Sequence, residues 1–181
     1  MVVVLAVIAI LAAVLTPIVT SYVERARLEA ARSDLKNIVA AIVQYNTDTK
    51  VWPIYTTTAF STTPDINGSV YDVVTTTGND AIAGGGYTGS STNGALDSIL
   101  NANSMNVTTS GVRAWRGAYL ELGADPWGTR YYLTAKSLKP GNTSAAFVLS
   151  PGPNQTIDTT MVQSQSGAVT TGGDDLVIRI K

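Results

Sequence analysis

The sequence predicts a one-domain α+β fold. In this fold a long N-terminal helix, kinked near Pro17, packs by its C-terminal half on a small antiparallel β-sheet. Two observations predict it: residues 1–46 carry a continuous helical pattern, and the last third of the chain holds three short β-rich runs separated by turn signals. The length of 181 residues fits one domain.

The first segment, residues 1–23, is apolar and has no charged side chain. About 20 apolar residues in a helix span roughly 30 Å, the thickness of a bilayer core. The segment is therefore either a membrane span or the buried core helix of an assembly. A secretory signal peptide fits poorly, because no basic residue precedes the apolar run and no small-residue cleavage site ends it. The residues predicted to pack in an assembly are Val4, Ile8, Leu11, Leu15 and Pro17.

Pro17 lies inside this predicted helix. Proline has no backbone N–H to donate, and its ring clashes with the carbonyl four residues earlier, which is that of Ala13. A kink or a short unwound stretch is therefore expected around residues 13–17. Such a weak point either lets the helix stretch during packing or is a static kink.

The helix continues beyond the apolar segment with one apolar face. From residue 28 to residue 45, apolar residues recur at spacings of three and four, which is the period of one helix face. The polar residues at 46–49 and Pro53 end the helix. The predicted stripe consists of Leu28, Ala31, Leu35, Ile38, Ile42 and Tyr45, widened by Val39 and Val43.

Residues 24–181 are predicted to form a globular head that contains a polar insertion at about 54–112. Thr, Ser, Gly and Asn dominate the insertion, and such a composition favours turns over packed elements. We expect a surface loop or a display surface with too little apolar content for the core, although residues 95–100 allow one or two helical turns. Sugars on Ser and Thr, or at the sequons of Asn67, Asn106, Asn142 and Asn154, are a further expectation.

The strands are expected near the C-terminus, in residues 130–135, 145–150 and 176–181. In the last run Leu176, Ile178 and Ile180 alternate with more polar positions, so one face of this strand is apolar. Pro-Gly turns separate the runs. A small antiparallel sheet is the natural partner of the amphipathic half-helix.

The composition excludes several functions. Lys and Arg total 12 and Asp and Glu total 13, so the net charge is -1, whereas a nucleic-acid binder usually shows a basic excess. The chain contains no Cys and no His, which excludes thiolate zinc sites, cysteine nucleophiles and Ser-His-Asp hydrolysis. No pair of carboxylates lies in an apolar context, so we expect no enzyme.

Several motifs resemble those of type IV pilins and type II secretion pseudopilins. The segments AVIAILAAVLTPIVTSY and RARLEAARSDLKNIVAAIVQYNTDTKVWP look like the family's N-terminal helix. A block made of Trp115, Arg116, Gly117, Asp125, Pro126, Trp127 and Gly128 is similar to the family's W-R-G-x-Y-L and D-P-W-G motifs. Residues 150–154 and 172–176 resemble its closing loop. The resemblance covers about residues 1–53 and 112–181.

The chain departs from the family in its first residues. The resemblance implies a Glu at the fifth position of the mature chain, and aligned on Pro17 this chain begins about one residue after it. Leu5 is not its equivalent. Either residues before Met1 are missing from the sequence or this assembly device is absent, and we expect the former.

The D-P-W-G motif is predicted to form a turn. Asp125 bonds the backbone ahead of it, Pro126 sets φ, and Gly128 permits a left-handed conformation. Trp115 and Trp127 are predicted to be core anchors that pack on the sheet and the helix.

The closing loop is a predicted calcium site. Asn154, Asp158, Asp174 and Asp175 are hard oxygen donors of the kind that calcium prefers, and the resemblance implies that a loop at this position binds calcium. The family usually has Asp where this chain has Asn154, and the loop is longer here. The alternative is that Asp174 and Asp175 form a solvated turn before the last strand.

The resemblance implies a structural subunit that polymerises through its apolar helix into a type IV pilus-like extracellular filament. Its expected partners are copies of itself, the inner membrane that anchors it before assembly, and pilus or secretion machinery that includes a prepilin peptidase. The alternatives are a major pseudopilin of a type II secretion system, and a membrane-anchored protein whose insertion binds surfaces.

Overall fold

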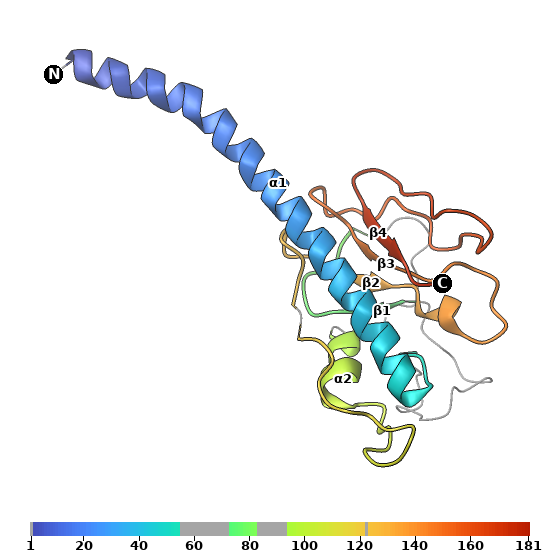
Figure 1. The fold of residues 1–181 in the computed structure, drawn as a ribbon. Helices are drawn as coiled ribbons and strands as arrows, with labels where there is room; N and C mark the ends of the chain where they lie inside the picture. The colour runs from blue at the N-terminus through green and yellow to red at the C-terminus, as the bar shows by residue number, and fades with distance from the viewer. Residues whose placement is uncertain (1, 55–72, 83–93, 122) are drawn as a thin grey trace.

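The computed structural model describes residues 2–54, 73–82, 94–121 and 123–181. It confirms the predicted fold class, with a long N-terminal helix and a small four-stranded antiparallel sheet (Figure 1). Helix α1 spans Val2–Thr49 and has 48 residues, which corresponds to a length of about 72 Å. Its N-terminal half projects away from the head, and its C-terminal half lies along the head (Figure 1).

Pro17 does not interrupt α1. The backbone is helical on both sides of Pro17, so the unwound stretch considered for residues 13–17 is not formed. The projecting half of the helix curves instead (Figure 1). A curve is compatible with the missing N–H of Pro17, because the remaining hydrogen bonds of the helix share the distortion.

The sheet has the strand order β1-β2-β3-β4, and each neighbouring pair is antiparallel. Across the sheet, Tyr132 pairs with Leu149, and Leu149 pairs with Val177. Three strands lie inside the predicted β-rich runs, and a short 3₁₀ helix, η1 (Ala135–Leu138), follows β2. The strands are β1 (Val74–Thr75), β2 (Tyr132–Leu133), β3 (Phe147–Ser150) and β4 (Leu176–Arg179).

The main hydrophobic core contains residues of α1, α2 and the sheet. The predicted stripe of α1 enters it through Leu35, Ile38, Ile42 and Tyr45, all with 0% of their surface exposed. Val74, Leu133 and Val148 of the sheet belong to the same cluster, and Leu176, Ile178 and Ile180 pack against it. Leu28 and Val39 are half-buried. Val43 remains 44% exposed, so the stripe is narrower than predicted.

The polar insertion is not purely a surface feature, and this expectation was wrong. Within residues 54–112, β1 pairs with β2, and helix α2 (Ala95–Ala102) places Leu96 and Ile99 in the main core at 0% exposure. The apolar residues of α2 are few, but they fall on one face of two helical turns. Residues 55–72 and 83–93, which include the Asn67 sequon, lie outside the described residues.

The opposite face of the sheet carries a second core. Tyr132, Phe147 and Leu149 alternate with the residues that face the main core, as the period of two in a strand requires. Ile157 and Met161 cover them from the long loop between β3 and β4. This loop is therefore packed on the sheet.

Candidate functional site

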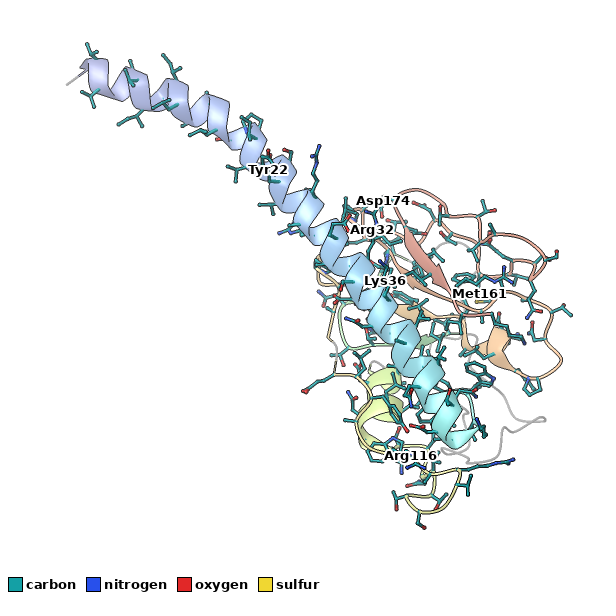
Figure 2. The ribbon with its side chains drawn as sticks, viewed as in Figure 1. Tyr22, Arg32, Lys36, Arg116, Met161 and Asp174 are labelled. Atoms are coloured by element: carbon teal, nitrogen blue, oxygen red, sulfur yellow. The ribbon has the colours of Figure 1, made fainter. Side chains whose placement is uncertain are left out.

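The projecting half of α1 carries most of the exposed large apolar side chains that the structure describes. Val4 is 62% exposed, Ile8 57%, and Leu11 and Leu15 55% each. Every other large apolar side chain described between residues 3 and 23 is exposed as well. Figure 2 shows these side chains, Tyr22 among them, standing away from the head. The predicted assembly residues thus lie on a surface that the head does not cover.

By length and composition this helix could also cross a membrane. Its apolar window has a mean hydropathy of 2.2, and none of that window is buried. The core helices of soluble proteins are mostly buried, and signal sequences occur near the N-terminus and meet the same criteria. The exposure of the whole window argues against a core helix of this chain, whereas a membrane span and a signal sequence both fit it.

The D-P-W-G motif forms the predicted turn around a buried carboxylate. Asp125 Oδ1 accepts hydrogen bonds from the backbone N–H groups of Trp127 (3.0 Å) and Thr129 (2.8 Å). Its Oδ2 accepts from the hydroxyls of Thr129 (2.6 Å) and Ser150 (2.7 Å). Gly128 has φ 90°, a left-handed conformation that favours glycine. Because Ser150 ends β3, the turn is fixed to the sheet.

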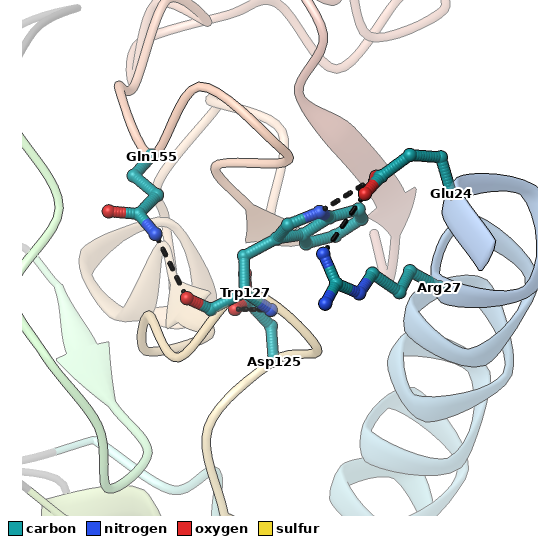
Figure 3. Close-up of polar contacts among 5 residues, drawn as sticks. All are labelled: Glu24, Arg27, Asp125, Trp127 and Gln155. Atoms are coloured by element: carbon teal, nitrogen blue, oxygen red, sulfur yellow. Dashed lines mark hydrogen bonds and ion pairs between the residues drawn. The ribbon is translucent and has the colours of Figure 1, made fainter. Parts of the chain in front are cut away.

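Trp127 connects this turn to α1 (Figure 3). Its indole N–H donates to Glu24 Oε2 over 3.3 Å, and the other oxygen of Glu24 pairs with Arg27 at 3.0 Å. The Trp127 carbonyl accepts a hydrogen bond of 2.9 Å from Gln155 Nε2. A chain of contacts thus joins the loop after β3 to the helix at the end of its apolar segment. Trp127 is half-buried at this junction and belongs to neither described core, so the prediction that it is a core anchor was wrong.

Trp115 lies at the other end of the head, by the C-terminal end of α1. It packs against the main core and meets Tyr119 edge-on, with ring centroids 6.1 Å apart, and Tyr119 meets Tyr45 of α1 at 5.5 Å. The Trp115 indole N–H is buried without a hydrogen-bond partner among the described residues. Arg116 is exposed, and Gly117 has φ 123°. Trp115 thus packs against the main core, whereas Arg116 faces solvent.

The four residues predicted for calcium are brought together by hydrogen bonds. Asn154 donates from its backbone N–H to Asp174 Oδ2 (2.9 Å) and from its amide to Asp158 Oδ2 (3.2 Å). Asp175 Oδ2 accepts from the backbone N–H groups of Asp158 (3.0 Å) and Thr159 (2.6 Å). A Cβ on Gly173, which has φ 50°, would collide with the Asp158 carboxylate. The two turns therefore meet closely.

The donors of this cluster fit calcium in kind. Asp174 Oδ1 and Asp175 Oδ1 are buried and have no hydrogen-bond partner, and a cation would satisfy such oxygens. Burial raises the pKa of Asp175 above its usual value, and nearby Asp158 raises it further, against hydrogen bonds from Thr159 and Asp158 that lower it. Within the described ranges, no three acidic, His or Cys side chains group as a metal site. Amide and carbonyl oxygens would have to complete the ligand set.

Sequence reasoning missed two contacts of α1 with the head. Glu24 directly follows the apolar segment, and its carboxylate accepts the hydrogen bond from Trp127. Asp34 lies outside the predicted apolar stripe, yet its carboxylate accepts a 2.9 Å hydrogen bond from the hydroxyl of buried Tyr131. Burial, then this hydrogen bond and the Asp34 charge, raise the pKa of Tyr131. No local pattern identifies such pairs, since about a hundred residues separate them.

The sequons that the structure describes differ in access. Asn106 and Asn154 are exposed, whereas Asn142 is half-buried. The Asn142 side chain accepts a hydrogen bond from the backbone N–H of Ser144 and donates one to the carbonyl of Lys136.

The fold and these sites define an α+β protein with a structural core and a long uncovered apolar helix. Comparisons with protein-family models, curated proteins and solved structures found no match to this chain.

Proposed function

We propose that this chain is the structural subunit of a helical filament in which the apolar halves of α1 from neighbouring copies bury one another. The filament is a type IV pilus-like extracellular fibre. Before assembly, the same helix anchors the subunit in the inner membrane, where a prepilin peptidase and assembly machinery act on it. The resemblance of the helix, the tryptophan block and the closing loop to the pilin family supports this proposal, which assigns the chain no catalytic activity.

The observation that carries the proposal is the exposure of the projecting half of α1. Burying one Val, Leu or Ile side chain contributes roughly 1.5–3 kcal/mol. The exposed side chains between Val3 and Val23 therefore provide a large driving force for association, which the head cannot satisfy. Parallel packing of these helices removes them from water without a membrane.

The contacts between Glu24, Trp127 and Gln155 support a fixed direction of the helix. They lie directly after the apolar segment and tie α1 to the head. A helix held in one direction presents the same surface in every copy, and regular helical polymers need such repetition.

Electron microscopy of the fraction sheared from cells that express the full chain tests this function. We expect fibres that contain the chain. Fibres confined to the periplasm would instead support a secretion pseudopilus. A chain found only as membrane-bound particles would refute the filament and support an anchored surface-binding protein.

Two substitutions test whether the apolar helix drives assembly. Ile8→Asp and Leu11→Lys each place a charge where neighbouring helices would pack, and an unpaired buried charge costs several kcal/mol. Both variants should lose fibres. The matched control is Thr143→Asp, which places a charge at an exposed head residue outside the apolar helix and should assemble normally. Normal fibre yield from Ile8→Asp would contradict a dry helical core.

A further inference from the structure

The loop of residues 108–117, which we name the tip loop, is basic. It contains Arg113 and Arg116, both exposed, and no acidic residue occurs between Asp97 and Glu121. Within the described parts of the chain, neither guanidinium forms an ion pair.

The tip loop has a defined conformation. The backbone N–H of Trp115 donates to the backbone carbonyl of Thr108 over 2.7 Å and closes the loop. Thr108 and Ser110 also form two hydrogen bonds with each other. Val112 at its apex is 92% exposed. The surface beside the apex is a hollow of about 510 Å³, lined by Thr109, Gly111, Ala114, Trp115, Arg116 and Gly117.

The loop of residues 150–176, which we name the closing loop, has the opposite charge. It contains Asp158, Asp174 and Asp175, and no Lys or Arg occurs between Lys139 and Arg179. Asp158 is exposed. A divalent cation bound here would change the formal charge of these carboxylates from about −3 to about −1 and would leave its sign unchanged.

Neighbouring elements weaken this contrast without reversing it. The Arg179 guanidinium of β4 donates to the carbonyls of Gln165 and Gly167 and places one positive charge at that part of the closing loop. Beside the closing loop, the helix cations Arg27 and Arg32 are paired with Glu24 and Glu29. At the tip, Asp48 and Lys50 of the α1 terminus carry one charge of each sign.

The two loops lie at opposite ends of the head. The closing loop contacts Trp127, which contacts Glu24, whereas Arg116 donates its backbone N–H to the Tyr119 hydroxyl, and the Tyr119 ring meets Tyr45. Glu24 and Tyr45 are separated by about 31 Å along a helix. Figure 2 agrees: Arg116 lies at the end furthest from the N-terminus, and Asp174 lies near the point where α1 leaves the head.

We infer that the tip loop of one copy docks on the closing loop of a second copy, with Arg113 and Arg116 beside Asp158 and Asp174. This contact rests on the proposed filament, because parallel helices point all heads the same way and bring a basic tip toward an acidic end. Such a contact joins two different surfaces, so it repeats from copy to copy in a filament, where the rotation between copies does not close a ring. Exposed ion pairs weaken as salt rises, so the contact sets register and salt sensitivity while the apolar helices hold the fibre together.

Cysteine crosslinking tests this contact on assembled fibres, since the chain has no cysteine of its own. The variant Val112→Cys with Asn154→Cys should give a ladder of disulfide-linked multimers on mild oxidation. Val112 is 92% exposed at the loop apex and Asn154 is exposed, so both arginines and the three carboxylates stay in place. The matched control replaces exposed Thr143 instead, as Val112→Cys with Thr143→Cys, and should give no ladder. Fibres of the Val112/Asn154 variant without a ladder would overturn the contact.

Charge exchange provides a second test with wild-type cysteine content. Arg113→Glu with Arg116→Glu should lower fibre yield at low salt, by roughly two- to fivefold for each lost pair. Adding Asn154→Lys and Asp158→Lys to that variant should restore the yield, which a merely misfolded head would not do. Unchanged yield in the double variant, or no rescue in the quadruple variant, refutes the contact. If the wild-type chain forms no fibres at all, the proposed function itself fails.

Discussion

Ile99→Ala in α2 should destabilise the head by about 3 kcal/mol, the middle of the range for removing a fully buried Ile side chain. Ile99 is 0% exposed and lies in the main core with Leu96 and residues of α1. Its removal leaves a cavity between α2 and that core. In a domain of this size, 1 kcal/mol shifts Tm by roughly 2–4 °C, so Tm should fall by about 6–12 °C.

The assay is thermal unfolding of residues 24–181, followed by circular dichroism. Among the described residues, this fragment keeps every one that is buried in the core, because the first is Ala31. It should be a soluble monomer without the apolar segment. Val112→Ala is the matched control, since Val112 is 92% exposed and such substitutions change stability by about 0.5 kcal/mol or less. A Tm for Ile99→Ala within 1 °C of the control would show that α2 lies on the surface of the head and would refute its place in the core.

Three further predictions concern the head. If the closing loop binds calcium, the Tm of the head should fall on addition of a chelator, because a ligand at a hundredfold excess over Kd stabilises the folded state by about 2.7 kcal/mol. Asp174→Ala should remove this sensitivity to the chelator. An unchanged Tm in chelator would refute the site. Burial raises the pKa of Asp97 more than its hydrogen bonds from Thr77 lower it. The folded head therefore binds the Asp97 proton more tightly than the unfolded chain does. The stability that this proton adds is present below the ordinary pKa and is lost as pH rises through the raised pKa. Asp97→Asn should therefore raise Tm more at pH 7 than at pH 3, and an equal change at both values would contradict this. Trp127→Phe removes the 3.3 Å hydrogen bond to Glu24 and should speed amide hydrogen exchange near Glu24. Trp115→Phe is the control and should leave this exchange unchanged. Equal exchange rates in the two variants would show that the hydrogen bond does not hold α1 against the head.

The local pattern was sufficient for α1 and for strands β2, β3 and β4. Ala31, Leu35, Ile38, Ile42 and Tyr45 recur with the helical period, and all are buried. Leu176, Ile178 and Ile180 alternate with the period of a strand, and all pack on the main core. Periodicity predicts such elements because the geometry of a helix or a strand decides which residues share a face.

The tertiary structure decided how distant segments use polar residues. Composition placed α2 and β1 in a surface insertion, yet Leu96 and Val74 lie in the core, because a few apolar residues on one face suffice where a larger core receives them. Asp125, Glu24 and Asp34 gain partners in other elements.

The sequence by itself determined a charge-free apolar segment, residues 1–23, and an amphipathic continuation of the same helix. It also placed four oxygen donors in two turns near the C-terminus. Only the tertiary structure decided that the head leaves the apolar segment uncovered and that the two turns meet through Asn154 and Asp174. It also decided that Arg116 and Asp174 lie at opposite ends of the head. The physical reason is that periodicity reports on neighbours within one element, whereas contacts between elements depend on how the whole chain packs.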